Sequence, residues 1–207
     1  MKKILFIAAV LTVLHSPFSV LHSQGRFDAH VFAGLNMGQI DGDRSDGYSH
    51  PGLRAGVGTS FALGDDLASP WRMVVELAFT NKGSYNKSYN TTLSVNYIEV
   101  PILLSYNLLD NRLRLAAGVA PAVKIGSSFT DGGGSAIGGE DDFVAVDWLP
   151  LTVSARYRFT DHLGIEGRLQ YSATSVTNDN VSGTYFLFRS NKGCFHNLVN
   201  IGLTYTF

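Results

Sequence analysis

The chain has 207 residues, enough for one domain or two small ones. Charged residues make up 16% of it, well below the roughly 25% of an ordinary soluble domain. Apolar and aromatic residues are plentiful, which excludes a disordered chain. The net charge of −1 gives no reason to expect nucleic acid as a partner. The single cysteine, Cys194, cannot form an internal disulfide.

The N-terminal segment has the pattern of a secretory signal. Lys2 and Lys3 precede an apolar stretch at 4–14, which is too short for a transmembrane helix of roughly 20 residues. A small polar region follows, with a cleavage position before Gln24. We therefore expect a cleaved signal peptide over residues 1–23 and one domain over residues 24–207. A retained N-terminal anchor or a core helix is the alternative for the first segment.

From residue 27 onward, apolar residues recur at every second position, which is the pattern of β-strands. Eight stretches have it, with no helical period and no linker between them. They are 27–37, 52–63, 71–80, 97–106, 112–125, 149–159, 163–173 and 198–207. The sequence therefore predicts an all-β fold, a single eight-stranded antiparallel up-and-down barrel.

The connections between these stretches alternate in length. Those at 64–70, 109–111 and 160–162 are short, whereas those after the first, third, fifth and seventh stretches are long and rich in Gly, Asn, Asp and Ser. An up-and-down meander places all the long connections at one end. Short periplasmic turns opposite long external loops are typical of bacterial outer-membrane barrels.

The two faces of each stretch differ in bulk as well as polarity. One face is bulky and almost free of charge; the other is mainly Gly, Ala, Ser and Thr with single charged residues. The interior of an eight-stranded barrel only just accommodates packed side chains, and one Arg or Lys in mid-bilayer costs about 2–4 kcal/mol. We therefore expect a transmembrane barrel with its apolar face outward. Aromatic residues suited to an interfacial girdle are Phe27, Phe61, Trp71, Tyr106, Phe159, Tyr205 and Phe207.

Charged residues on the small polar faces are predicted to point into the lumen. They are Arg54, Arg72, Glu76, Glu99, Arg112, Arg114, Lys124, Arg156, Arg158, Glu166 and Arg168. In a narrow interior they must pair and hydrogen-bond. A salt-bridged plug is the favoured interpretation, and an anion-preferring path is the alternative.

Other candidate chemistry is weak. Asp41, Asp43 and Asp46 in the first long loop, and 140–142 in the third, do not match a calcium-binding loop and indicate solvated loop charge. His30 and His196 lie in no nucleophile motif. The sequence thus predicts no catalytic residue, metal or cofactor. In the fourth long loop, the apolar cluster at 185–189 indicates a hairpin or a patch for a partner.

Residues 96–106 read Asn-Tyr-Ile-Glu-Val-Pro-Ile-Leu-Leu-Ser-Tyr, which resembles the YIEIP-LLxY element of the PorT-like family of outer-membrane β-barrels. Gly34-Leu35-Asn36 resembles the GxN element of that family, and Phe207 its terminal aromatic residue. The resemblance implies an integral outer-membrane location and a porin-like barrel, and no particular activity. Tyr205 and Phe207 also resemble the terminal-strand signal that the barrel-assembly machinery recognises.

The function predicted is therefore an integral outer-membrane barrel, not an enzyme, with a plugged polar lumen and long external loops. Its expected partners are outer-membrane lipid, the assembly machinery and an unidentified surface or periplasmic partner, in a structural or adhesive role. A small-solute channel and a secreted lipocalin-like carrier with an apolar cavity are the alternatives.

Overall fold

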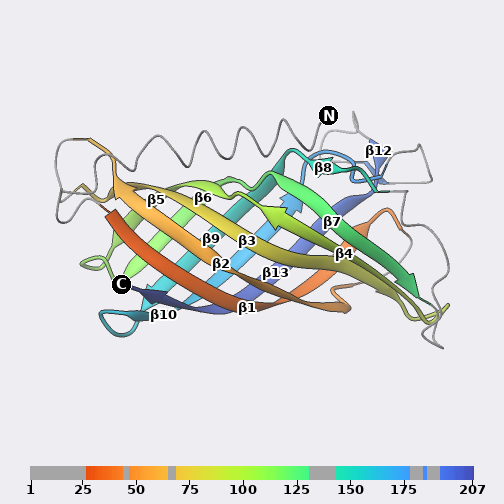
Figure 1. The fold of residues 1–207 in the computed structure, drawn as a ribbon, viewed down its shortest axis with the longest axis horizontal. Helices are drawn as coiled ribbons and strands as arrows, with labels where there is room; N and C mark the ends of the chain where they lie inside the picture. Colours follow the sequence, from red (N-terminus) through yellow and green to blue (C-terminus); the bar gives the residue numbers. More distant parts are fainter. Residues whose placement is uncertain (1–26, 44–46, 65–68, 131–142, 178–183, 186–191) are drawn as a thin grey trace.

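A computed structural model describes residues 27–43, 47–64, 69–130, 143–177, 184–185 and 192–207 (Figure 1). The predicted signal peptide, 1–23, lies outside these residues, as do Asp46, the acidic run 140–142 and positions 186–189 of the apolar loop cluster. Within the described ranges, no helix has the length and apolar character needed to cross a membrane.

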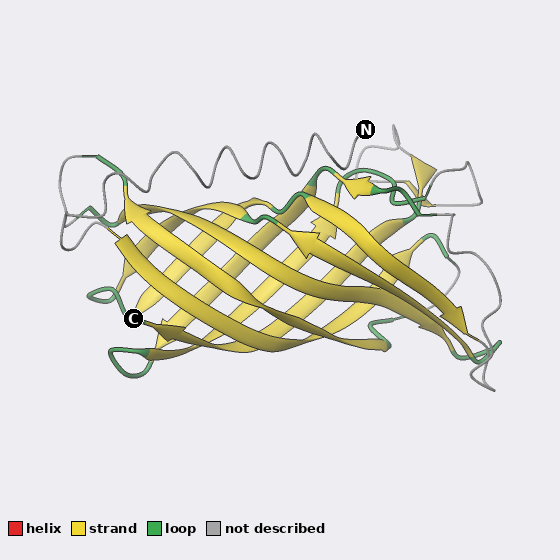
Figure 2. Ribbon diagram, viewed as in Figure 1, coloured by secondary structure: helices red, strands yellow, loops and turns green. Residues whose placement is uncertain are grey.

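The described residues form an antiparallel β-barrel (Figure 2). Its strands are β1 (Phe27–Asp41), β2 (His50–Ala62), β3 (Trp71–Asn86), β4 (Thr91–Glu99), β5 (Ile102–Leu108), β6 (Leu113–Val119), β7 (Ala122–Thr130), β8 (Val146–Asp147), β9 (Pro150–Arg158), β10 (Leu163–Ser172), β11 (Thr184–Tyr185), β12 (Lys192–Gly193) and β13 (Phe195–Thr206).

Eight strand segments, which we call staves, make up the barrel wall, as the sequence predicts. A stave is one full crossing of the wall, even where a short break divides it into two strands. β4 with β5, β6 with β7, and β8 with β9 are each one stave with a short interruption. Around the ring the order is β1, β2, β3, β5, β6, β9, β10 and β13, and β13 pairs with β1 to close it. In this ring β3 lies opposite β10, and β2 lies opposite β9. The small pair β11–β12 stands apart from the wall.

Three prolines lie at the breaks in three neighbouring staves, and the carbonyl of each still accepts a hydrogen bond from the next strand. Pro101 accepts from the Glu76 amide at 3.0 Å, Pro121 from Val100 at 2.9 Å and Pro150 from Ala120 at 2.9 Å. Because proline has no N–H, each of these positions lacks one ladder donor. We call Pro101, Pro121 and Pro150 the proline line.

The side chains alternate across the wall as predicted. Outward-facing Leu35, Val57 and Leu169 are 61%, 53% and 53% exposed, whereas inward-facing Arg54 and Glu76 are buried. A polar interior and an apolar exterior are the reverse of a lipocalin-like carrier, so that alternative is wrong. The girdle aromatics gather at the short-turn end. Rings contact across strands in the pairs Phe27–Phe61 and Trp71–Tyr106, and Tyr205 contacts Phe207 within the C-terminal segment.

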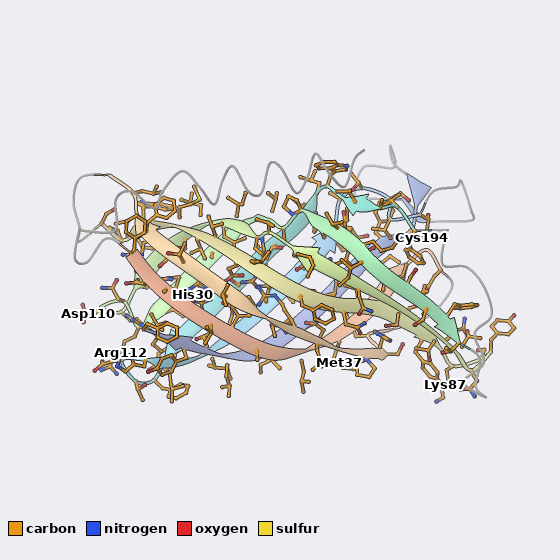
Figure 3. All side chains as sticks on the ribbon, in the orientation of Figure 1. His30, Met37, Lys87, Asp110, Arg112 and Cys194 are labelled. Carbon is orange, nitrogen blue, oxygen red and sulfur yellow. The ribbon has the colours of Figure 1, made fainter. Side chains whose placement is uncertain are left out.

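One predicted loop is largely strand. The third connection, expected as a long loop over 81–96, is a β-hairpin: β3 continues to Asn86 and β4 begins at Thr91. Its residues are mostly polar, and Leu93 and Val95 are too few to give the hydrophobic alternation that marks the other strands. This hairpin extends the wall at the end away from the short turns, with Lys87 at its tip (Figure 3).

Candidate functional site in the barrel interior

A cluster of ion pairs occupies the middle of the interior, centred on Glu76 of β3. Its carboxylate accepts from Arg54 of β2 at 2.6 Å, from Arg168 of β10 at 2.8 Å and from Arg156 of β9 at 3.3 Å. His30 Nε2 lies 3.2 Å from the same group. Since β3 and β10 are opposite staves, the Glu76–Arg168 pair joins two walls across the bore.

Glu166 of β10 is the second anion of this cluster. Its carboxylate lies 2.7 Å from Arg156, 2.9 Å from Arg168 and 3.6 Å from Arg54. Each arginine therefore contacts both carboxylates, and all five side chains are buried. Three guanidinium groups face two carboxylates, so the cluster formally carries one excess positive charge. We call Arg54, Glu76, Arg156, Glu166 and Arg168 the central cluster.

Toward the loop end, Glu99 of β4 pairs with a lysine that sequence reasoning missed. Lys82 Nζ lies 2.7 Å from Glu99 Oε1, and Thr80 donates to Glu99 Oε2 at 2.9 Å. Lys82 is fully buried. Its position was assigned to a loop, and only the extension of β3 to Asn86 turns it inward.

The short-turn end holds a smaller group. Asp28 Oδ2 accepts from Arg72 at 3.1 Å and lies 3.5 Å from Arg114, and both arginines donate to the Ser60 hydroxyl. The predicted lumen residues Arg72 and Arg114 therefore share one partly exposed carboxylate.

The loop end of the interior also contains an apolar cluster. His196 Nε2 lies 3.1 Å from the Tyr97 hydroxyl and stacks on Phe143. Around them is a buried cluster made of Ile40, Val95, Tyr97, Ala122, Phe143, Val176 and Cys194. Beside it the Asp147 carboxylate accepts from Ser172 at 2.5 Å and from Thr174 at 3.3 Å.

Three predicted lumen charges lie elsewhere than in these groups. Arg158, on the same face of β9 as Arg156, is partly exposed at the short-turn rim and donates to the Asn111 carbonyl. Arg112 is exposed in the turn before β6 at the same rim, so for Arg112 the lumen prediction is wrong. The cause is the turn itself: Leu109, Asp110 and Asn111 all have positive φ, and β6 begins only at Leu113. Figure 3 places Asp110 and Arg112 at this end. Lys124 donates to the Phe143 carbonyl at 3.0 Å near the loop end.

The remaining candidates have ordinary structural contacts. Asp41 accepts from Gln39, and Asp43 accepts from Ser84. Cys194 is buried beside the loops, and this burial raises the pKa of its thiol. Among the described His, Cys, Asp and Glu residues, no three gather as a metal site.

Comparisons with known proteins agree with this architecture. A family model for the outer membrane protein beta-barrel domain matches residues 18–178. The crystal structure of Neisserial surface protein A, from Neisseria, is similar at 14% identity and a TM-score of 0.55, covering 86% of this chain and 97% of that one.

A second similar structure is that of Ail, the attachment invasion locus protein of Yersinia pestis, in complex with the heparin analogue sucrose octasulfate. It is 11% identical with a TM-score of 0.51, and the match covers 88% of this chain and 99% of that one. At these identities the likeness is one of fold. No curated protein matches the chain.

Proposed function

Since the chain belongs to the outer membrane protein beta-barrel domain family, we propose that it is a non-conducting barrel of the bacterial outer membrane that presents its loop end to an external partner. The Glu76–Arg168 ion pair across the bore is the observation that carries the first half of this proposal. Tight charge-assisted pairs between opposite walls leave little room for a solute in a bore that eight staves already make narrow.

Two further layers support a plugged lumen. On the loop side of the central cluster, Lys82 pairs with Glu99, and beyond that pair Tyr97 and Phe143 belong to a buried apolar cluster. Charged side chains in such a setting need their partners to remain buried. A continuous aqueous path would have to separate several of these contacts.

Planar-bilayer recording tests the plug. The purified wild-type barrel is expected to give no stable conductance steps, while a Glu76→Ala, Arg168→Ala double variant gives steps. Heat-modifiable mobility on gels confirms that both samples are folded. Stable steps from the wild-type barrel would instead establish the small-solute channel, for which Arg72 and Arg114 around the single carboxylate of Asp28 provide a basic mouth.

The β3–β4 hairpin is the surface that we propose contacts the external partner. Asn86 accepts from the amides of Ser88 and Tyr89, and the Tyr85 hydroxyl donates to Asn90 at 2.8 Å, so the tip is held by its own side chains. Tyr89 is 78% exposed. Tyrosine combined with Ser and Asn is the composition that antibody loops use for recognition.

Cell adhesion tests this surface. Cells that display the wild-type barrel are expected to bind their target surface more strongly than cells that display Tyr89→Ser. The control is Asp110→Ser at the opposite rim, which should bind like the wild type. Equal binding by all three at equal surface expression would reject the hairpin as the contact surface. The named complex of Ail with sucrose octasulfate suggests a sulfated glycan as the first ligand to try.

Export and assembly complete the proposal. We propose removal of residues 1–23 before Gln24, which N-terminal sequencing of the mature protein checks. Tyr205 in the last strand is 39% exposed and Phe207 directly after it is 72% exposed, and these outward positions support recognition by the assembly machinery. Residues 96–106, in which Pro101 belongs to the proline line, support placement among PorT-like barrels.

A further inference from the structure

Several buried polar atoms next to the central cluster have no hydrogen-bond partner among the described residues. Three are obligate donors: Arg54 Nε, Arg168 Nη1 and Gln170 Nε2. The hydroxyl of Thr152 is also without a partner. All four side chains are at least nine-tenths buried. Leaving such buried donors unpaired is costly, so each is expected to have a partner.

The strand register brings these groups together. Thr152 of β9 is paired directly with Gln170 of β10, and Arg168 is two residues before Gln170 on the same inward face. Directly paired residues have Cβ atoms about 4.5–5.5 Å apart. Arg54 comes from the opposite side, and its guanidinium lies 3.6 Å from Glu166 on β10. The residues that carry these donors on β2, β9 and β10 are therefore buried in the same part of the bore, around Glu166 and Gln170.

The unpartnered polar atoms in this region are mainly hydrogen-bond donors. Among the buried atoms of the described residues, Glu99 Oε1 is the one carboxylate oxygen without a hydrogen bond, and it already lies 2.7 Å from Lys82 Nζ. The other atoms without partners are imidazole nitrogens and hydroxyls, which can act in either role. A water molecule would bring hydrogens that need acceptors of their own, whereas an anion only accepts. The excess positive charge of the central cluster favours the anion further.

We propose that the bore holds a small monovalent anion, of the chloride class, coordinated by Arg168 Nη1, Gln170 Nε2, Arg54 Nε and the Thr152 hydroxyl. We call this the lumen anion site. We expect a single halide and not a larger anion, because Leu198 beside Gln170 and Asn200 beside Arg168 are also buried there. Asp147, the carboxylate on the loop side, is already bonded to Ser172 and Thr174 and so bounds the site without filling it.

The site goes beyond the proposed plug and does not depend on it. A static anion can sit in a closed bore, and bilayer recording decides conduction separately. Failure of the anion site in the tests below would therefore leave the plug standing, and conduction by the wild type would leave the anion site standing.

Bromide provides the direct test. Crystals of the folded barrel grown in sodium bromide are expected to give an anomalous peak within hydrogen-bonding distance of Arg168 Nη1 and Gln170 Nε2. A peak of water density alone at that position, with no anomalous signal, would overturn the proposal.

Stability in solution provides the second test. The urea midpoint of the barrel in detergent micelles is expected to be higher in sodium chloride or bromide than in sodium gluconate at equal ionic strength, because a ligand that binds only the folded state stabilises it. Equal ionic strength removes general screening. A midpoint that is the same in all three salts would contradict the site.

Matched variants locate the effect. Gln170→Leu removes one donor and is expected to reduce the dependence of the urea midpoint on halide at least tenfold. Thr204→Val is the control: it removes another unpartnered hydroxyl, in a different part of the bore, and should keep the dependence. Gln170→Glu places a carboxylate beside Arg168 and should make the barrel indifferent to halide. Thr152→Val replaces Gln170→Leu if the latter does not fold. Retained halide dependence in Gln170→Glu would refute the assignment.

Discussion

Neutralising Glu76 should destabilise the barrel far more than neutralising any rim carboxylate. The substitution Glu76→Gln keeps the size of the side chain but removes the charge that faces three guanidinium groups at 2.6, 2.8 and 3.3 Å. Arg54, Arg156 and Arg168 would then share Glu166 alone. Breaking one partner out of a buried ion pair costs about 3–5 kcal/mol, and we expect a loss in this range.

The matched control is Asp28→Asn at the short-turn end. Asp28 also faces two arginines, but its side chain is 34% exposed, so solvent screens the pair and the expected loss is below about 1 kcal/mol. Equilibrium unfolding in urea, with the barrel in detergent micelles and tryptophan fluorescence as the signal, measures both. The reasoning fails if Glu76→Gln loses no more stability than Asp28→Asn at an unchanged urea slope.

Three other predictions use different parts of the wall. Val57→Arg on the outward face should cost about 2–4 kcal/mol in lipid vesicles, whereas Tyr89→Arg at the hairpin tip should leave the unfolding free energy unchanged; equal costs would mean that Val57 does not face lipid. Gly56→Ala should cost about 1–3 kcal/mol, because a Cβ there would lie 2.2 Å from the Leu77 carbonyl oxygen. Gly167→Ala, where a Cβ meets nothing within 4 Å, is its control in the same urea assay, and similar losses would refute the close-approach argument. Burial raises the pKa of Cys194, so less thiolate is present at pH 8 than for a free cysteine; maleimide should label it slowly in the folded barrel and fully after heating, and rapid labelling of the folded form would contradict its burial.

The sequence predicts the part of the barrel that faces lipid better than the part above it. Outward residues such as Val57 and Leu169 must be apolar, so their period of two is visible without a structure. Residues of the β3–β4 hairpin have no such requirement, and Asn81, Gly83 and Ser84 read as loop. Lys82 was missed for this reason.

Faces are predictable, but partners across the bore are not. Alternation assigns Glu76 and Arg168 to the interior, and the up-and-down order makes the third and seventh strands opposite, yet nothing in the sequence says that these two residues lie at the same level. That depends on the stagger accumulated around the ring, which arises from all the strand registers together. The lumen anion site was invisible for the same reason, since Gln170 and Thr152 are unremarkable polar residues until their register makes them neighbours.

The proline line is a row of positions across three neighbouring staves at which the backbone hydrogen bonding of the wall is weaker. A closed cylinder held by an unbroken ladder tends to open as one cooperative unit, but here three adjacent staves each lack a donor. We therefore expect β4 and β7, on the loop side of the proline line, to open locally while β5, β6 and β9 keep their hydrogen bonds. The loop end of the barrel would then be more dynamic than the short-turn end. Amide exchange should then reveal two tiers of protection along the same staves. Local opening of the loop end would let it adapt to a bound partner while the ion pairs of the central cluster stay in place.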